Sequence, residues 1–164
     1  GVALDDLPGD PRPLDATLLD SAAGFLFLGA QGWTDARQTA LETALARRPR
    51  PVLCANPDLV APLEGAFSRE PGAFAHRLAA LGQTVHFVGK PYAQGFAAAR
   101  ARLPGIPPAR IAMVGDSPHT DILGGAAAGL ATVLVTGHGL LRGLDPGPIL
   151  AATGIVPDVL ICDP

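Results

Sequence analysis

The chain has 164 residues, of which 48% are hydrophobic, with a formal net charge of −3 and a pI near 5.7. This length suits one ordinary domain, or one and a half small ones, and the apolar content is sufficient for a hydrophobic core. No apolar run approaches the length of a membrane span, no basic-then-apolar leader opens the chain, and the acidic balance offers no basic surface, so we expect a cytoplasmic protein that binds neither membranes nor nucleic acid.

Apolar and polar patterns divide the chain into alternating strands and helices. Residues 1–23 are polar and rich in proline, which favours a loop or linker with a short ordered piece at 14–19. The elements expected after it, in chain order, are a strand at 24–28, a helix at 34–47, a strand at 52–55, a helix at 71–81, a strand at 85–88, a helix at 92–103, a strand at 111–114, a helix at 119–128, a strand at 132–135, a weak helix at 148–152 and a strand at 159–162. Thr34 is the expected N-cap of the first helix, and Gly129 should end the fourth.

The alternation of strands and helices predicts crossover connections and a mostly parallel sheet, so the expected fold class is α/β. The stretch at 59–70 contains Pro62, Gly65 and mixed charge, and it is the expected boundary between two lobes. We therefore expect one lobe at 1–58, which includes the N-terminal linker, then a connector at 59–70, and a second unit at 71–164.

Two acids follow one of the expected strands on a turn. Asp116 comes directly after the strand that Gly115 ends, and Asp121 lies five positions further on. In an open parallel sheet, ligands bind at the carboxyl ends of the strands, so both carboxylates can face that crevice. Carboxylate oxygens in this position suit Mg²⁺, which favours one or two carboxylates together with water and a substrate phosphate.

Each of these polar residues also has a purely structural interpretation. Asp116 can serve as a turn former, and Asp121 can lie at a helix N-terminus, where the helix dipole favours an acid. Asn56 and Asp58, which follow the second strand, can likewise form a simple turn. The occurrence of two acids at one strand end favours a functional role for Asp116 and Asp121 over a purely structural one.

Lys90 is the only lysine among 12 basic residues, and it follows a strand that ends at Gly89. A lysine is a compact point charge on a flexible stem, whereas an arginine is a planar fork. Chance in an Arg-rich composition is one explanation, but the position at a strand end makes Lys90 a candidate site residue. A nucleotide-binding P-loop is excluded here, because positions 84 and 91 hold Thr and Pro where that motif needs Gly and then Ser or Thr.

The cysteines and histidines give weaker signals. Cys54 and Cys162 each lie in an apolar run, and we expect buried small hydrophobic residues rather than a disulfide or a metal pair. The four histidines have no partner His or Cys at metal-ligand spacing. His119 and His138 follow strand ends, which makes them candidates for a contact with a substrate.

Three short motifs resemble one known family. Residues 114–125 (VGDSPHTDILGG) resemble the fourth signature of the haloacid dehalogenase superfamily of phosphatases, and residues 89–91 (GKP) resemble the third. Residues 54–58 (CANPD), followed by 71–73 (PGA), are similar to the class IIA branch, of the p-nitrophenylphosphatase type. The resemblance implies a three-layer core with a parallel sheet, of which this chain holds the second half, and part of an α/β cap lobe.

The resemblance also implies roles for the candidate residues. Asp116 would bind Mg²⁺ directly, and Asp121 would ligate the ion or hold its water shell. Lys90 would neutralise the phosphoryl oxygens and the charge of the nucleophile. The residues implied to lie near the substrate, at the cap or beside the metal, are Asn56, Asp58 and Ser117.

One part of the family pattern does not occur in these 164 residues. The family begins with an Asp-x-Asp signature on its first core strand, in which the first Asp is the covalent nucleophile and the second is the general acid–base. Asp5-Asp6 and Asp20-Ser21 do not follow apolar runs, and they precede the expected cap. The resemblance therefore implies a nucleophile outside this chain and an inactive chain when it is isolated.

Two functions from different classes remain compatible with the sequence. The first is a Mg²⁺-dependent phosphatase that hydrolyses small phosphorylated metabolites through an aspartyl-phosphate. The second is a non-catalytic fragment or interaction module, because half of a doubly wound sheet leaves an open edge and an uncovered apolar face. Such a module would form a homodimer or pair with the missing N-terminal half.

Overall fold

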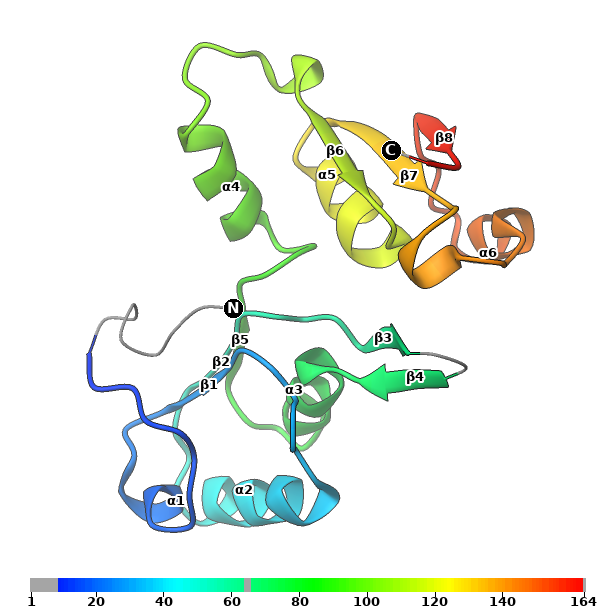
Figure 1. The fold of residues 1–164 in the computed structure, drawn as a ribbon. Coiled ribbons are helices and arrows are strands. Elements are labelled where there is room, and N and C mark those ends of the chain that lie inside the picture. Colours follow the sequence, from blue (N-terminus) through cyan, green and yellow to red (C-terminus); the bar gives the residue numbers. More distant parts are fainter. Residues whose placement is uncertain (1–8, 64–65, 164) are drawn as a thin grey trace.

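The computed structural model describes residues 9–63 and 66–163, and each predicted helix or strand within these ranges has a counterpart (Figure 1). The strands are β1 (Phe25–Phe27), β2 (Val52–Cys54), β3 (Val60–Leu63), β4 (Ala66–Arg69), β5 (Val85–Phe87), β6 (Ala112–Gly115), β7 (Ala131–Val135) and β8 (Val159–Ile161). The α-helices are α1 (Leu18–Ser21), α2 (Asp35–Arg47), α3 (Pro71–Ala80), α4 (Ala93–Ala101), α5 (Leu123–Ala127) and α6 (Pro146–Thr153). The short helical turns are η2 (Pro108–Arg110), η3 (Pro118–Ile122) and η4 (Gly139–Leu141). None of the helices in the described ranges is long and apolar enough to cross a membrane.

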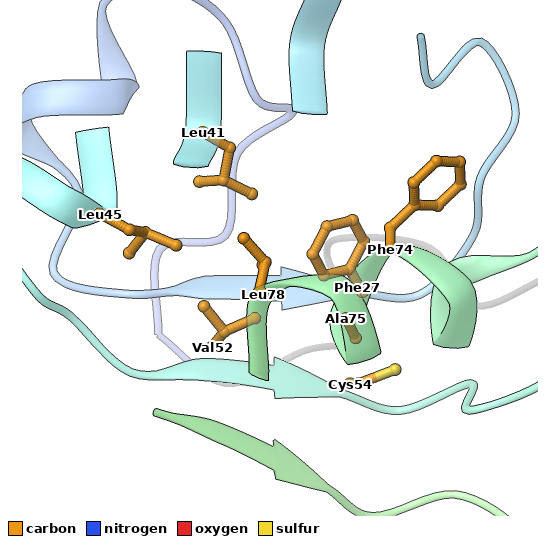
Figure 2. Close-up of a cluster of buried hydrophobic side chains, with 8 residues drawn as sticks. All are labelled: Phe27, Leu41, Leu45, Val52, Cys54, Phe74, Ala75 and Leu78. Carbon is orange, nitrogen blue, oxygen red and sulfur yellow. The ribbon is translucent and has the colours of Figure 1, made fainter. Parts of the chain in front are cut away.

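The first parallel sheet has the strand order β1-β2-β5. Helices α2 and α3 cover one face, where their leucines pack against Phe27 and Val52 in the first hydrophobic core (Figure 2). The middle residues of β1 and β2 point the other way, and Leu26 and Leu53 are 41% and 37% exposed. The structure thus buries only one face of these strands.

The range 59–70, where the sequence predicts a connector, instead contains the antiparallel hairpin β3–β4. Val60 pairs with Arg69 and Leu63 pairs with Ala66. Pro62 cannot donate to a ladder and therefore argues against an interior strand, but it is compatible with a two-stranded hairpin, in which each strand has a free edge. The hairpin contacts η4 through β3, and it thus reaches the loops of the second sheet.

The second parallel sheet has the strand order β6-β7-β8. Its inner face packs against η3, α5 and α6, and Ile122, Leu134 and Leu141 form the second buried core there. On the opposite face Val114 and Val159 are 49% and 48% exposed. This sheet and the helices packed on it occupy the upper part of Figure 1, and the first sheet with α1, α2 and α3 occupies the lower part.

The α/β class with parallel sheets is confirmed, and within the described residues each parallel sheet has one helix-covered face. One feature differs from the expected architecture: β5 pairs with β2, although a boundary at 59–70 assigns that strand to the second unit. Strand pairing depends on how the chain crosses over in space, which the local pattern of residues does not encode.

Local sequence signals locate the helix ends as expected. The Thr34 side chain accepts a hydrogen bond from Arg37 N at 3.2 Å, and Gly129 follows α5 with a φ of +73°.

The two cysteines differ in burial. Cys54 is buried, and burial raises the pKa of its thiol to about 11. Cys162 is exposed, so its predicted burial is wrong, because it lies beyond the end of edge strand β8. Residues 1–8 of the expected N-terminal loop lie outside the described residues.

Candidate active site

An ion pair joins the segment after β5 to the turn η3. Lys90 Nζ lies 2.5 Å from Asp121 Oδ1. The Asp121 side chain is 3% exposed and the Lys90 side chain 48% exposed, so the buried carboxylate meets an ammonium group that still has access to solvent. Because a buried charge is costly unless it is paired, the contact with Lys90 explains why a buried carboxylate is tolerated at position 121. The chain segment that carries Lys90 runs from the lower to the upper part of the molecule (Figure 1).

The second oxygen of Asp121 is held by the turn after β6. Ser117 N donates a hydrogen bond to Asp121 Oδ2 at 3.2 Å. Gly115 leaves the space for this carboxylate, because a Cβ at position 115 would collide with Oδ2. Both sequence neighbours of Asp116 thus touch Asp121, so the two acids and Lys90 lie at the same end of β6.

Asp116 is fixed by the loop that follows β7. Leu140 N donates a hydrogen bond to Asp116 Oδ2 at 2.7 Å. No donor of the described residues reaches the other carboxylate oxygen, Oδ1. Because parallel neighbours end at the same rim of a sheet, β6 and β7 bring together residues that are 24 positions apart in sequence.

Asp58 brings a third carboxylate from the first sheet to this rim. Burial raises the pKa of the Asp58 carboxyl above its usual value, while the Lys90 charge and the Thr120 hydroxyl oppose the rise and Asp121 adds to it. Thr120 Oγ1 is itself buried, and it forms no hydrogen bond of acceptable geometry with the described residues. Asp58 therefore faces Lys90, Asp121 and Thr120 across the junction of the two units.

Asn56 contributes a side-chain oxygen to the site, whereas Ser117 contributes its backbone N–H. Asn56 Oδ1 accepts a hydrogen bond from Asp58 N at 3.3 Å, which closes the turn after β2 as in the structural interpretation of this residue. Ser117 contributes the N–H that holds Asp121, whereas the structure describes no hydrogen bond from its hydroxyl. Contact of either side chain with a substrate stays a prediction.

Three participants were not identified from the sequence: Thr120, Gly139 and Leu140. Thr120 lies in the acidic turn, but nothing in its local pattern predicts a contact with the segment after β2. For the other two residues a signal exists, because Gly137-His138-Gly139 follows a strand end in the same way as Gly115-Asp116 does. Two glycines at a strand end indicate a close approach of backbone to other groups, which here are Cys162 for Gly137 and the Asp116 carboxylate for Gly139.

The donor set fits part of a magnesium site. Asp116 Oδ1 is free to bind a cation, and Asp121 lies beside it with both of its oxygens already in hydrogen bonds. Mg²⁺ usually takes one or two protein carboxylates and completes its octahedron with water and phosphate oxygens. The described residues contain no group of three or more His, Cys, Asp or Glu placed to hold a metal ion. These acids could thus supply one or two ligands.

Comparisons with known proteins find similarity to one group of hydrolases. Residues 87–159 match the family model described as HAD-hydrolase-like. A "possible sugar phosphatase" of the HAD superfamily from Cytophaga hutchinsonii is 29% identical, with a TM-score of 0.76 over 92% of this chain and 55% of that chain. The p-nitrophenyl phosphatase from Archaeoglobus fulgidus is 25% identical, with a TM-score of 0.70 over 88% of this chain and 55% of that chain.

A haloacid dehalogenase-like hydrolase from Brucella suis shows the same relationship, with 27% identity and a TM-score of 0.69 over 86% of this chain and 55% of that chain. The chain thus spans about half the length of these relatives. No curated protein matches it. Residues 87–159 thus match a HAD-hydrolase-like family model, and most of the chain is similar in structure to hydrolases and phosphatases of the haloacid dehalogenase superfamily.

Proposed function

We propose that the protein containing this chain is a Mg²⁺-dependent phosphatase that hydrolyses phosphate monoesters of small metabolites. The observation that carries this proposal is the contact between Lys90 and Asp121 beside the Asp116 carboxylate, at the carboxyl end of β6. One ammonium group and two acids at a strand end are suited to receive a divalent cation and a phosphate together. The names of the two phosphatase relatives support the same reaction class.

In this proposal each residue acts by position and charge. Asp116 Oδ1 would hold the metal, and the bound ion would supply positive charge against the phosphoryl oxygens. Asp121 orients Lys90, and the solvent-accessible ammonium of Lys90 faces the phosphoryl group and the nucleophile. Asn56, Asp58 and Ser117 lie near the entering substrate. The nucleophile that forms the aspartyl-phosphate and the general acid lie outside these 164 residues. In this proposal the protein works in the cytoplasm.

The test is the hydrolysis of p-nitrophenyl phosphate by the longer protein with and without Mg²⁺. Asp116→Ala should reduce kcat/KM at least about 100-fold, since removing one preorganised electrostatic group from a site of this kind has an effect of that size. Asp20→Ala, which removes an exposed acid far from β6, is the control. Full turnover by Asp116→Ala would contradict the proposal.

The isolated 164-residue chain is a second subject for the same assay. It should not hydrolyse p-nitrophenyl phosphate, because the Asp-x-Asp pair is not among its residues. Robust hydrolysis by the purified chain would show that the nucleophile is one of the residues described above.

A second candidate function is that of an interaction module, and the exposed valine face favours it. Val114 and Val159 are about half exposed on one face of the second sheet, and β6 has an edge without a partner strand in the described residues. Unpaired edges and apolar faces promote association, so the chain would form a homodimer or pair with an N-terminal half. A clean monomer in size-exclusion chromatography would contradict this candidate.

A further inference from the structure

The loop after β7 makes unusually close contact with the Asp116 carboxylate. Leu140 N donates to Oδ2 at 2.7 Å. At the preceding residue, Gly139, a Cβ would collide with Oδ2 and lie within 3 Å of the carboxylate carbon and of the Asp116 Cβ. Gly139 also has a φ of +65°, a backbone conformation that L side chains rarely adopt. The space beside Gly139 is thus occupied by the acid itself.

The loop is anchored on both sides of this contact. Before it, Thr136 N donates to Ile161 O at 2.9 Å and Gly137 N donates to Cys162 O at 2.8 Å, which ties the loop to the end of β8. After it, Leu141 is 2% exposed and forms part of the second core. The backbone at 139–140 therefore has little freedom to retreat, and any collision would have to displace the acid.

We propose that Gly139 and the N–H of Leu140 are positioning groups for the metal-binding acid. The N–H engages Oδ2 and leaves Oδ1 to bind the cation, so Asp116 would act as a monodentate ligand of fixed direction. Groups that orient a ligating carboxylate change metal affinity when they are altered, and Mg²⁺ tolerates little deviation from octahedral geometry. This inference rests on the proposed function, since it assigns a purpose to the contact only if Asp116 holds a metal.

The first experiment compares Gly139→Ala with Gly143→Ala in the longer protein. Gly143 has a φ of +77°, and a Cβ there would meet nothing within 4 Å, so its variant carries the backbone strain without the collision. The Mg²⁺ dissociation constant, measured by calorimetry, should rise about 10- to 100-fold in Gly139→Ala and stay unchanged in Gly143→Ala. Equal affinities of wild type and Gly139→Ala would overturn the inference.

A second pair of variants removes only the hydrogen bond, in case the added methyl prevents folding. An amide-to-ester replacement at Leu140 deletes the N–H that Asp116 accepts. The same replacement at Leu144 deletes an N–H that donates to Leu141 O at 2.9 Å, one backbone hydrogen bond in the same segment. Only the ester at Leu140 should weaken Mg²⁺ binding, and equal affinities of the two esters would overturn the inference.

The wild-type protein separates this inference from the proposed function. If the wild type binds no Mg²⁺, the phosphatase proposal fails, and the positioning role fails with it. If the wild type binds Mg²⁺ and both altered proteins bind it equally well, only the positioning role fails. In Asp116→Ala the Leu140 amide resonance should move upfield in ¹H–¹⁵N spectra, because its acceptor is lost, and an unmoved resonance would also count against the contact.

Discussion

At the scale of single residues, Asp58 has an environment unlike that of the other acids near the rim. Asp121 is buried but meets Lys90 at 2.5 Å, whereas Asp58 is partly buried and faces Lys90 without an ion pair within 4 Å. Burial is the largest cause of its raised pKa, and the Lys90 charge only partly opposes it. The folded state thus binds the Asp58 proton more tightly than the unfolded state does.

This pKa shift predicts a pH dependence of stability. Because the folded-state pKa lies above the ordinary value of 3.8, Asp58 destabilises the fold increasingly as the pH rises through that value, and the effect is complete above the folded-state pKa. Asp58→Asn should therefore gain more stability at pH 7 than at pH 4, measured by urea unfolding. Asp20→Asn removes one exposed charge and serves as the control. A variant that is less stable than wild type at pH 7 would mean that attraction to Lys90 outweighs burial.

At the scale of elements, two glycines in helices differ in whether their surroundings leave space for a side chain. Gly72 in α3 donates its N–H to Asp58 O at 2.9 Å, and a Cβ at this position would collide with the backbone of Pro57. Gly95 in α4 is exposed, and a Cβ there would have only Val88 O nearby, at 3.6 Å. The start of α3 therefore needs glycine for close approach to the segment that carries Asp58, and α4 does not.

The two alanine variants should change stability in opposite directions. Gly72→Ala should cost about 1–3 kcal/mol, since the added methyl must push apart two packed backbones. Gly95→Ala should gain up to about 1 kcal/mol, since alanine is the better helix former and no atom is in the way. Urea unfolding of the isolated chain measures both changes. Equal effects of the two substitutions would show that the contact between α3 and the turn after β2 is not rigid.

At the scale of the whole molecule, the apolar face of the second sheet is the feature that should govern association. Val114 and Val159 lie on the face opposite α5 and α6, and both pair with Val133 of β7, one on each side. Val156 is more exposed, at 82%, but it lies in the loop before β8 and not in the sheet. A lysine in the sheet face should therefore affect association, whereas a lysine in the loop should not.

The prediction is tested with Val114→Lys and Val156→Lys in the isolated chain. If the sheet face mediates self-association, Val114→Lys should shift the size-exclusion profile toward monomer, because a charge cannot be buried there without a partner. Val156→Lys should leave the profile as in the wild type. Identical profiles for all three proteins, with a dimer present, would place the contact on another surface.

Much of the local structure could be predicted from sequence because its causes lie within a few residues. The N-cap Thr34, the glycine after α5 and the apolar runs each act over one or two turns of chain, and they locate the helices and strands. The five-residue spacing of Asp116 and Asp121 likewise places both acids at one strand end. The likeness to haloacid dehalogenase-like proteins follows from motifs of this local kind.

Only the tertiary structure decided which strands pair and which distant groups meet. Pairing of β5 with β2, the β3–β4 hairpin around Pro62 and the exposure of Cys162 all depend on neighbours that lie far away in sequence. The same holds for the N–H of Leu140 on Asp116, a contact between residues 24 positions apart. Sequence patterns record which residues prefer a strand end, but the choice of partner at that end depends on the path of the chain between strands.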